Sequence, residues 1–436
     1  MISKSPLTTY EDIKESVIDL LDSTSKKKQE FIFVTGPAGT GKSTLIEDVK
    51  KEVDKNKIVV APTGIAALNI GGKTIHSVFR LGFEPIPPIK EYKDPKFRKL
   101  IKNLEILIID EISMVKAPIL DAISRSLQLH RKSKKPFGGV SVLVCGDLFQ
   151  LPPVMNQYDE KIILDLYESP FFFDAACFYE IQEPKIFELT ESFRQQDDSH
   201  FLDLLNNIRL GLNLQETVNT INRTCFDPQF EEETAMTVTS RTRRSEDLNK
   251  HQLQLIEDQE KEFKAKERGE FKESELPAPR ELVLKKGAQV IFTKNDSEGR
   301  WVNGSIGKVL DVSSKKQIEV KIQNVSYKVE REKWVKESYI YDEINDEIHT
   351  EEVAVYEQFP LKLGWSVTIH KSQGLTLESC SVDLGNGAFA PGQAYVALSR
   401  CKNLNSLHLH TELKASDIKL DPQVVDFYKY ICSTKH

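Results

Sequence analysis

Paired cysteines are missing from this sequence, because its six cysteines are widely spaced and form no Cys-x-x-Cys pair. That spacing argues against a zinc site or a disulfide framework and is typical of reduced thiols in a cytosolic protein. No run approaches the roughly 18 apolar residues that a membrane-spanning helix needs. Residues 1–10 show no basic start followed by an apolar run, so no signal peptide is expected. We therefore expect a cytoplasmic protein with no membrane partner.

An excess of basic residues is missing too. The 59 Lys and Arg residues are outnumbered by 66 Asp and Glu residues, which gives a net charge of -7. Because Lys and Arg neutralise phosphates, this balance counts mildly against a nucleic-acid partner. A local basic groove is still compatible with it, since acidic segments elsewhere can outweigh the groove in the sum. At roughly 150 residues per domain, the 436 residues suggest about three domains.

Short apolar runs alternate with helical patterns in the first third of the chain. Apolar residues recur at helical spacing over 10–28 and again from 42 to about 51. The apolar runs cover residues 31–34, 58–61, 106–109 and 140–145. This alternation predicts an α/β fold with a parallel sheet and helices on both faces. Ligands bind at the carboxyl ends of such strands, where all four runs end in Gly, Pro, Thr, Asp or Glu.

The second half of the chain changes character. Residues 257–280 are more than half charged, with mixed signs, and we interpret them as a solvated helix or linker. Closely spaced β-branched runs then predict a small β-barrel, at 282–284, 289–292, 306–309, 318–322 and 325–329. The α/β pattern returns from about 359. The predicted domains are therefore 1–187, a second α/β domain formed by 188–256 and 359–436, and an inserted helical and β-barrel domain over 257–358.

A glycine-rich turn follows the first apolar run and precedes a helical pattern. Residues 36–43 read G-P-A-G-T-G-K-S, which matches the phosphate-binding loop G-x-x-x-x-G-K-[ST]. Glycines let backbone N–H groups wrap the phosphates, the lysine neutralises them, and the serine hydroxyl binds Mg²⁺. The alternative, a chance glycine-rich turn, is disfavoured by the strand before it and the helix after it. The expected nucleotide-binding residues are Gly36, Gly39, Thr40, Gly41, Lys42, Ser43 and Thr44.

Polar residues follow the third and fourth apolar runs. Asp110 suits direct or indirect binding of Mg²⁺, and the adjacent Glu111 can orient and deprotonate an attacking water. Alone, an acid at a strand end is a weak signal, but its position downstream of a phosphate-binding loop favours the catalytic interpretation. Gln150, in the loop after the fourth run, is a candidate sensor of the γ-phosphate, with an ordinary polar loop as the alternative.

Two arginines are candidates for phosphoryl-transfer chemistry. Phosphoryl transfer spreads negative charge over the γ-phosphate oxygens, and a guanidinium group from another domain can stabilise that charge. Arg194 lies in the segment L-T-E-S-F-R-Q, and Arg400 ends the segment Y-V-A-L-S-R. Most arginines are simply solvated, so spacing alone gives either residue no better than an even chance of this role.

Seven segments occur in the order of the motifs of superfamily-one helicases: 36–44, 61–66, 110–114, 146–154, 189–195, 368–374 and 393–400. Three further segments are more specific: K-P-F-G-G at 135–139, V-N-G-S-I-G at 302–307, and L-G-W-S-V-T-I-H-K-S-Q-G at 363–374. Through these segments the chain resembles the petite-integration-frequency (Pif) helicases, which belong to the 5′-to-3′ subgroup of superfamily one. It resembles a bacterial-type minimal core of that family. The resemblance covers about residues 31–402.

Two positions depart from the family pattern. Ser366 stands where the family usually has alanine, which is a small-for-small change. Related helicases often carry a glutamine near the N-terminus that reads adenine, but residues 7–11 contain none, and Gln29 nearly abuts the first apolar run. The source of adenine recognition is therefore left open.

The resemblance implies two RecA-like P-loop domains, an inserted SH3-like β-barrel and a short wedge insertion at about 80–102. ATP would bind between the two domains, with Ser43 and Asp110 holding Mg²⁺. Glu111 would be the catalytic base and Gln150 the γ-phosphate sensor. Arg194 and Arg400 would reach in from the second domain.

Single-stranded DNA would lie across both RecA-like domains. Hydroxyl and backbone N–H groups suit phosphates, which carry no sequence information. Phe79 is a candidate stacking face, although a core aromatic is at least as good an interpretation, and His76 and His370 have the alternative of capped core histidines. The expected DNA contacts are Pro62, Thr63, Gly64, Thr74, His76, Ser77, Phe79, Asn303, Thr368, His370 and Lys371.

The function expected from these features is an ATP-dependent 5′-to-3′ DNA helicase that translocates on single-stranded DNA and unwinds duplex or forked DNA. Its cofactors would be ATP and Mg²⁺, and it would act as a monomer in the cytoplasm, on the nucleoid of a prokaryote. The family adds G-quadruplexes and genome maintenance as further expectations. The alternatives are a nucleotide-controlled switch that binds a protein partner without translocating, and an RNA helicase.

Overall fold

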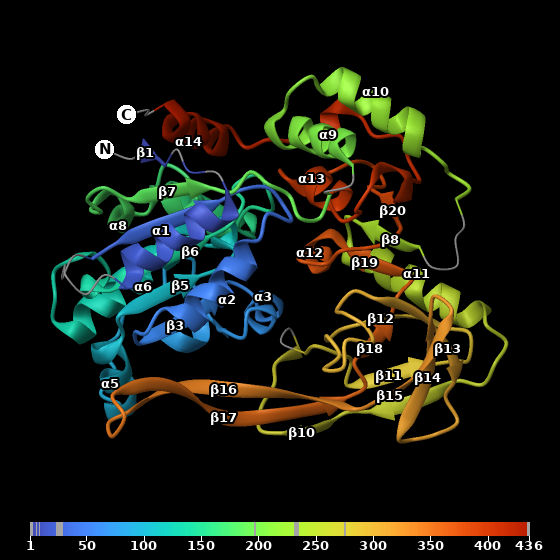
Figure 1. Cartoon of the computed structure of the whole chain (residues 1–436), viewed down its shortest axis with the longest axis horizontal. Coiled ribbons are helices and arrows are strands. Elements are labelled where there is room, and N and C mark those ends of the chain that lie inside the picture. The colour runs from blue at the N-terminus through green and yellow to red at the C-terminus, as the bar shows by residue number, and fades with distance from the viewer. Residues whose placement is uncertain are drawn as a thin grey trace. The chain divides into compact units, whose positions relative to one another are not determined.

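The computed structural model describes residues 3–5, 7, 9–22, 29–195, 198–230, 235–273 and 276–433. The chain divides into two compact units, shown in Figure 1. The first comprises residues 1–194, 338–351 and 420–436, and the second comprises residues 195–337 and 352–419. Within the described residues, no helix has both the length and the apolar composition needed to cross a bilayer.

The first unit is built on a seven-stranded sheet with the order β1-β7-β2-β6-β5-β3-β4, and all its strand pairs are parallel. The strands are β1 (Ser3–Lys4), β2 (Phe31–Thr35), β3 (Lys57–Ala61), β4 (Lys73–Thr74), β5 (Ile106–Ile109), β6 (Ser141–Cys145) and β7 (Lys185–Glu188). The central strands β2 and β5 are buried at every residue, as expected for a parallel sheet covered on both faces. The four predicted strands of this domain are confirmed.

Helices cover both faces of this sheet. On one face, Ile13, Leu45 and Ala67 pack against strand residues such as Val34. They come from α1 (Tyr10–Asp22), α2 (Lys42–Glu52) and α3 (Gly64–Asn69). The helix predicted over 10–28 is confirmed to Asp22, and 23–28 lie outside the described residues.

The other face is covered by an aromatic layer. Phe33 contacts Phe172 edge to face, and Phe427 stacks on Phe173 with ring centroids 4.2 Å apart. The elements that carry or flank this layer are α6 (Ala117–Arg131), η2 (Pro136–Gly139), η3 (Phe172–Asp174), α8 (Ala176–Tyr179) and α14 (Pro422–Ser433). Shorter elements complete the unit: α4 (Ile75–Phe79), η1 (Ile112–Met114) and α7 (Gln157–Leu164).

The predicted wedge insertion at about 80–102 contains a helix at its end. Helix α5 (Pro95–Asn103) begins after Asp94, whose carboxylate accepts from the backbone N–H of Lys96, and it buries Phe97 and Leu100. An N-terminal Asp cap followed by proline is a favoured helix start. The segment therefore consists of an irregular stretch followed by an anchored helix.

The second unit contains a four-stranded parallel sheet with the order β19-β8-β20-β21. The strands are β8 (Met236–Thr239), β19 (Ser366–Thr368), β20 (Cys380–Asp383) and β21 (Leu407–Leu409). The associated helices are α9 (Ser199–Leu210), α10 (Leu214–Cys225), α11 (Thr242–Leu255), α12 (Ile369–Ser372), α13 (Gln393–Leu398), η5 (Leu404–Ser406) and η6 (Ala415–Asp417). Strands β8 and β19 are paired although more than 100 residues separate them. The β-rich segment is therefore an insertion between two neighbouring strands of this sheet.

The inserted segment forms a five-stranded antiparallel sheet with the order β15-β14-β13-β12-β18. The strands are β12 (Gln289–Phe292), β13 (Ile306–Asp311), β14 (Gln317–Ile322), β15 (Val325–Glu330) and β18 (Leu361–Leu363). Val290, Val320 and Leu361 lie in its buried core with Trp301. These strands agree with the predicted runs, while β11 (Glu281–Leu284) pairs instead with β9.

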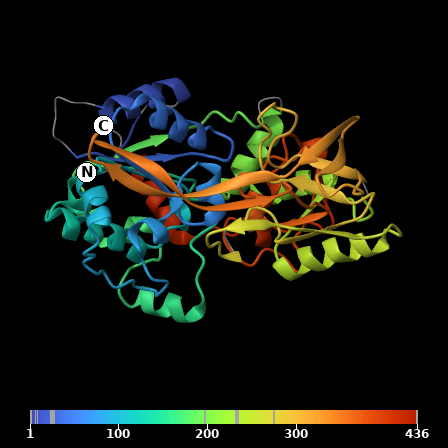
Figure 2. The same cartoon turned by 90° about the horizontal axis from the view of Figure 1, so that it is seen from below.

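The charged segment 257–280 was interpreted as a solvated helix or linker. The helix is wrong, because the described residues of this segment contain two strands joined by irregular stretches and no α-helix. Strand β9 (Lys261–Lys264) pairs with β11, and β10 (Lys266–Arg268) pairs with β17. Cross-strand ion pairs explain the mixed charges, since Lys266 meets Glu357 and Arg268 meets Glu352. Strands β16 (Glu332–Asp342) and β17 (Glu347–Gln358), which the sequence analysis did not identify, form the long ribbon seen in Figure 2.

The two units differ from the predicted domain boundaries at three places, the first being that residues 188–194 belong to the first unit. Helix α14 belongs to the first unit, where the Tyr428 hydroxyl donates to Glu188 at 2.9 Å. The tip of the β16–β17 ribbon also belongs there, and the Tyr339 hydroxyl bonds to the backbone of Val59. The α/β class is confirmed by the parallel sheets, whereas the division into three domains stays a prediction.

Candidate functional site

The phosphate-binding loop connects β2 to α2 in the first unit. Gly36, Gly39 and Gly41 have φ values of 146°, 80° and 88°, which side chains disfavour. A Cβ atom at Gly36 would lie 2.3 Å from the carbonyl oxygen of Leu189, so this turn leaves room for glycine alone. The Lys42 ammonium donates to the carbonyl oxygens of Gly36 and Pro37 at 2.8 and 2.7 Å. The loop is therefore built as the sequence predicts.

The remaining predicted phosphate residues surround this turn. Thr40 is buried, and its hydroxyl donates to the Pro37 carbonyl at 3.0 Å. Ser43 and Thr44 are exposed in the first turn of α2, where backbone N–H groups have no partner within the helix. That turn is a favourable place for an anion. Hydroxyl and N–H groups thus gather at the carboxyl end of β2.

Asp110 and Glu111 lie at the end of β5. Asp110 is 6% exposed, and one carboxylate oxygen accepts from the backbone N–H of Glu111 at 2.9 Å. Burial raises the pKa of Asp110 to about 6, although this hydrogen bond and the charge of Lys42 oppose the shift. The influence of Lys42 shows that the lysine and the carboxylate belong to one site. Glu111 has φ 49° and ψ 47°, a left-handed backbone that is unusual for glutamate.

Gln150 follows β6 and is 7% exposed. Its side-chain amide donates to Asp147 at 3.3 Å, and the other oxygen of Asp147 accepts from the backbone N–H of Phe149 at 3.2 Å. Asp147 therefore holds both the loop and the amide of Gln150. The parallel pairing of β2, β6 and β5 brings the ends of these strands to one sheet edge.

Arg194 lies beside the phosphate-binding loop, in the first unit. The backbone N–H of Phe193 donates to the carbonyl oxygen of Gly39 at 2.8 Å, and a Cβ atom at Gly39 would lie 2.6 Å from the Cβ atom of Arg194. Arg194 was expected to reach the site from the second domain, but the structure places it in the first unit, next to the phosphate-binding loop. The hydrogen bond from the neighbouring Phe193 to Gly39 holds Arg194 next to the loop.

Arg400 is 1% exposed in the second unit. Its guanidinium donates to the carbonyl oxygens of Val396, Ser372 and Leu375 at 2.7 to 3.2 Å, and to the Ser399 hydroxyl at 2.8 Å. These bonds tie α13 to the turn after α12. In this structure Arg400 is therefore engaged inside its own unit.

Gln29 has a structural role. Its amide donates to the carbonyl oxygens of Pro136 and Val140 at 2.6 and 2.9 Å, and it precedes β2, whereas the phosphate-binding loop follows that strand. The aromatic residues near the loop are Tyr10 and Phe193, whose ring centroids lie 5.9 Å apart. A Cβ atom at Gly41 would lie 3.0 Å from the Tyr10 ring. The sequence analysis missed this pair because the two residues are far apart in the chain.

The predicted DNA contacts of the first unit lie at two helix starts. The Thr63 hydroxyl accepts from the Ala66 N–H at the start of α3, and the Thr74 hydroxyl accepts from the Ser77 N–H at the start of α4. Pro62, Thr63 and His76 line a cavity of about 210 Å³ together with Phe83. Gly64, the first residue of α3, directly follows Thr63 in the sequence.

The exposed aromatic ring of this region is Phe83, not Phe79. Phe79 is 0% exposed, so its ring has no face for a base and the core alternative describes it. Phe83 is 74% exposed and stacks on His76, with ring centroids 4.9 Å apart and 12° between the planes. Both residues follow the same threonine-capped turn, but sequence spacing did not distinguish the buried ring from the exposed one.

The predicted contacts of the second unit surround α12. The Thr368 hydroxyl accepts from the Lys371 N–H at 3.3 Å, and both His370 and Lys371 are exposed. Asn303 lies in the turn between β12 and β13, where its N–H donates to the Asn295 side chain. A Cβ atom at the adjacent Gly304 would lie 3.5 Å from Thr376, so this turn packs near the end of α12. All four residues therefore lie in one part of the unit.

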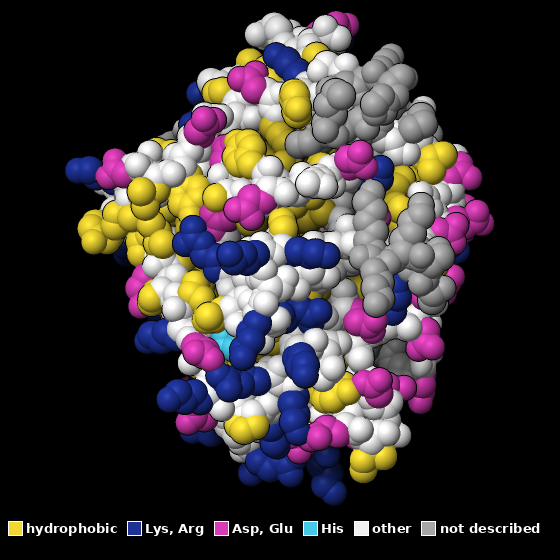
Figure 3. Space-filling view, turned by 90° about the vertical axis from the view of Figure 1, so that its left-hand side faces the viewer, with side chains coloured by type: hydrophobic (Ala, Val, Ile, Leu, Met, Phe, Trp, Pro, Cys, Tyr) yellow, Lys and Arg dark blue, Asp and Glu magenta, His cyan; other side chains and the backbone are white. Residues whose placement is uncertain are grey.

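Basic side chains gather on part of the first unit despite the acidic net charge. Figure 3 shows Lys and Arg concentrated in the lower half of one face, the end at which α5 lies in Figure 1. The exposed basic residues of α5 and of the segment after α6 are Lys96, Arg98, Lys99, Lys102, Lys132, Lys134 and Lys135. A basic surface of this kind is the electrostatic feature that phosphate binding requires.

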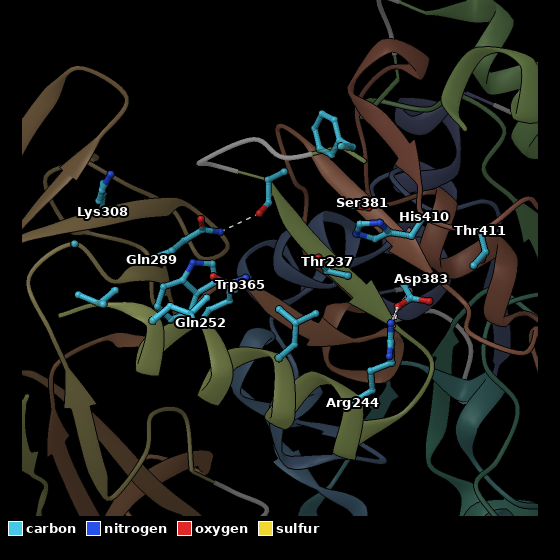
Figure 4. Close-up of a pocket in the computed structure, with 16 residues that line it drawn as sticks. Thr237, Arg244, Gln252, Gln289, Lys308, Trp365, Ser381, Asp383, His410 and Thr411 are labelled. Carbon is cyan, nitrogen blue, oxygen red and sulfur yellow. Dashed lines mark hydrogen bonds and ion pairs between the residues drawn. The ribbon is translucent and has the colours of Figure 1, made fainter. Parts of the chain in front are cut away.

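A second cavity, of about 940 Å³, lies in the second unit between α11, the parallel sheet and the inserted β-sheet, and is shown in Figure 4. Thr237, Ser381 and His410 line it from the strand side. An Arg244–Asp383 ion pair at 2.5 Å lies at its edge. None of the predicted site residues lines this cavity.

Comparison with known proteins identifies the family. The model of the PIF1-like helicase family matches residues 10–219. The ATP-dependent DNA helicase Pif1 of Bdellovibrio bacteriovorus is 33% identical over 95% of this chain and 90% of its own length. The human ATP-dependent DNA helicase PIF1 is 31% identical over 92% of this chain, which spans 61% of the human protein.

Solved structures agree. Bacteroides sp Pif1 in complex with ADP-AlF4 is 35% identical, with a TM-score of 0.87 over 98% of this chain and 97% of its own. Bacteroides Pif1 bound to single-stranded DNA gives a TM-score of 0.69 at the same identity and coverage. This similarity shows an α/β fold with RecA-like domains. The chain belongs to the PIF1-like helicase family.

Proposed function

We propose that this chain is an ATP-dependent DNA helicase that moves 5′ to 3′ on single-stranded DNA and unwinds duplex ahead of it. The observation that carries the proposal is the group at one sheet edge of the first unit, where Lys42, Asp110 and Glu111 follow β2 and β5. A nucleotide switch needs the lysine and the aspartate but gains nothing from a water-activating glutamate next to them. The family membership gives the class of reaction.

The phosphate-binding loop would hold ATP. Backbone N–H groups at Gly39, Gly41 and the start of α2 face the place where phosphates bind in such loops. Lys42 would exchange its bonds to the carbonyl oxygens of Gly36 and Pro37 for bonds to the β- and γ-phosphates. Ser43 and Asp110 are the oxygen ligands that Mg²⁺ prefers, and Mg²⁺ supplies charge neutralisation when bound. Burial raises the pKa of Asp110, and a bound Mg²⁺ would favour the charged carboxylate.

Hydrolysis requires an oriented water and stabilisation of the charge that develops on the γ-phosphate. We assign the water to Glu111 and the γ-phosphate contact to Gln150, which Asp147 holds in place. Arg194 would place its guanidinium at the γ-phosphate from its position beside Gly39. These three residues all belong to the first unit, so one rigid scaffold would position them.

Arg400 would act only after a rearrangement. Four hydrogen bonds hold its guanidinium in the second unit, so contact with a γ-phosphate requires that some of them be exchanged. An exchange of this kind would link nucleotide binding to the α12 turn, which carries the predicted DNA contacts His370 and Lys371. Movement along DNA then follows if the two RecA-like domains change their affinity for the strand at different steps of the cycle.

The strand would bind at the two capped turns of the first unit and at α12 of the second. Backbone N–H and hydroxyl groups at these turns suit phosphates. We place a base on the Phe83–His76 stack, because Phe83 offers an exposed ring and Phe79 does not. The same position makes Phe83 part of the wedge segment that separates the strands.

Forked DNA and single-stranded DNA are the proposed substrates. Bacteroides Pif1 has been solved bound to single-stranded DNA, and another solved structure concerns DNA unwinding at forked duplex DNA by two coordinating Pif1 helicases. G-quadruplexes and a role in genome maintenance are further expectations from the family. We propose a monomeric enzyme that acts on chromosomal DNA in the cytoplasm. The six free cysteines are compatible with a reducing compartment.

The test is the rate of ATP hydrolysis with and without an oligothymidylate strand. A helicase gives a rate that rises severalfold with the strand and is abolished in Lys42→Ala. A matched control is Lys51→Ala, which removes an exposed lysine from the end of the same helix. A basal rate that no DNA or RNA strand changes would favour the nucleotide switch, and a response to oligouridylate alone would favour an RNA helicase.

A further inference from the structure

Lys362 occupies an unusual position in β18. Its neighbours Leu361 and Leu363 pack into or against the core of the inserted β-sheet, so Lys362 points to the opposite face of that strand. It is paired in register with Ile291 of β12, which is 7% exposed. The outer face of the sheet is therefore covered at this point, and the lysine is half-buried rather than solvated.

The Lys362 ammonium has no partner among the described residues. No hydrogen bond or ion pair links it to another described group, whereas Lys294, two residues after β12, donates to Glu332 at 2.8 Å. A half-buried charge without a partner destabilises the fold, and such lysines are usually paired or replaced. The position therefore calls for an explanation other than stability.

The charged group that acts on Lys362 is another cation. Burial, and then repulsion from Lys371, lower the pKa of Lys362 to about 8. Lys371 is exposed in α12, among the predicted DNA contacts. The turn that contains Asn303 packs near the end of the same helix, since Gly304 approaches Thr376. Leu361, the neighbour of Lys362, pairs with Phe292, whose carbonyl oxygen accepts from the Gly304 N–H at 2.9 Å. The segments that carry Lys362, Asn303 and the end of α12 therefore adjoin one another, and their polar groups suit a phosphate.

We propose that Lys362 binds a backbone phosphate of the single strand and shares this anion site with Lys371. The proposal rests on the proposed function, and it adds a residue outside the helicase motifs. The two lysines come from β18 and α12, so a phosphodiester between them would hold the inserted β-domain and the parallel sheet on the same strand. A phosphate would supply the negative charge that no described carboxylate of the unit brings to Lys362.

The experiment measures the affinity of the full chain for a fluorescent oligothymidylate as a function of salt, in four proteins. These are the wild type, Lys362→Met, Lys362→Arg and the control Lys315→Met, which neutralises an exposed lysine in the turn between β13 and β14. Methionine keeps the length and apolar stem of the side chain, and arginine keeps the charge. Thermal unfolding of each variant shows whether it is folded.

For a single strand, the slope of log K against log salt changes by about 0.7 for each phosphate contact. We expect Lys362→Met to weaken binding about tenfold at low salt and to reduce the slope by about 0.7. Lys362→Arg and Lys315→Met should keep the slope of the wild type. A purely structural lysine would leave the slope unchanged in Lys362→Met and lower the unfolding temperature instead.

A pH series gives a second readout. A bound phosphate favours the charged lysine and raises its pKa, so the affinity should be complete below pH 8 and fall as the pH rises above it. Lys371 is the neighbouring charge that acts on Lys362. The fall should be absent in Lys362→Arg, because arginine stays charged over this range.

The outcomes separate the two proposals. Strand binding by the wild type, with the same salt slope in Lys362→Met, overturns the phosphate contact and leaves the helicase intact. A wild type that binds no oligothymidylate overturns both. A reduced slope in Lys362→Met that arginine restores establishes the contact.

Discussion

At the scale of single residues, the first unit separates nucleotide binding from hydrolysis. In the proposed site Lys42 and the loop around it would contact phosphates, whereas Glu111 follows Asp110 with a left-handed backbone conformation. Asp110 holds this backbone through its hydrogen bond to the Glu111 N–H. The two acids are adjacent in sequence and still have different environments, one buried and one partly exposed.

Glu111→Gln tests this separation. The amide keeps the size and hydrogen bonds of the side chain but cannot take a proton from water, and loss of a general base costs about 10²–10⁴-fold in rate. We expect ATP to bind with unchanged affinity in equilibrium dialysis while turnover falls by at least about 100-fold. Near-normal turnover in this variant would show that another group activates the water.

A second residue-scale prediction concerns Phe83. Stacking of one base contributes about 1–3 kcal/mol, so Phe83→Ala should weaken the binding of single-stranded DNA by about tenfold. The matched control is Tyr158→Ala, which removes a 71% exposed ring from α7. Fluorescence anisotropy with one labelled strand compares the three proteins. Equal affinities for Phe83→Ala and the control would remove Phe83 from the DNA path.

Residue identities were predicted well where the chemistry depends on local sequence. The loop from Gly36 to Ser43 and the acids after β5 lie as expected, because short-range geometry fixes them. Tyr10, Phe83 and Lys362 were missed, since their importance depends on which residues surround them in the fold. Phe79 illustrates the same limit: spacing alone did not reveal that its ring is buried.

At the scale of elements, the Pro-Phe-Gly-Gly turn η2 joins three parts of the first unit. The Arg131 guanidinium donates to the Gly138 carbonyl at 3.0 Å and to three carbonyl oxygens at the end of α5, those of Ile101, Lys102 and Leu104. Gln29 binds the same turn from the start of β2. The motif that the sequence marks as family-specific therefore anchors α5, the helix of the predicted wedge.

Two neighbouring glycines of this turn allow a matched test. Gly138 and Gly139 both have positive φ, 61° and 85°. A Cβ atom at Gly138 would lie 2.7 Å from the Leu127 carbonyl oxygen, whereas the nearest atom at Gly139 is the Lys135 Cδ at 3.8 Å. Both alanine variants suffer the left-handed strain of about 1–2 kcal/mol. Gly138→Ala should lose more, and chemical denaturation measures the difference; equal losses would contradict the packing described.

Elements with clear periodicity were predicted, and those with unusual composition were not. The runs that became β2, β5 and β12 are short and apolar, so their strand character follows from composition. The segment 257–280 has charges on both faces of β9 and β10, and its strands form through pairing with distant partners. The ribbon of β16 and β17 was missed for the same reason, since its exposed charges hide the alternation.

At the scale of the whole molecule, the proposed nucleotide site lies in one unit, and a further set of proposed DNA contacts lies in the other. A motor needs both sites, because ATP hydrolysis at the nucleotide site has to change the affinity of the DNA contacts for the strand. The Arg400 hydrogen bonds to Ser372 and Leu375 offer one physical route, since they join the last helicase motif to the turn after α12. The acidic net charge does not oppose this role, because the basic residues are concentrated locally.

The most direct measurement is ATP-dependent unwinding of one duplex that carries either a 5′ or a 3′ single-stranded tail. The account predicts that only the 5′-tailed duplex is unwound, and that Glu111→Gln abolishes unwinding. Unwinding of only the 3′-tailed duplex, or of neither duplex despite hydrolysis stimulated by DNA, would contradict it.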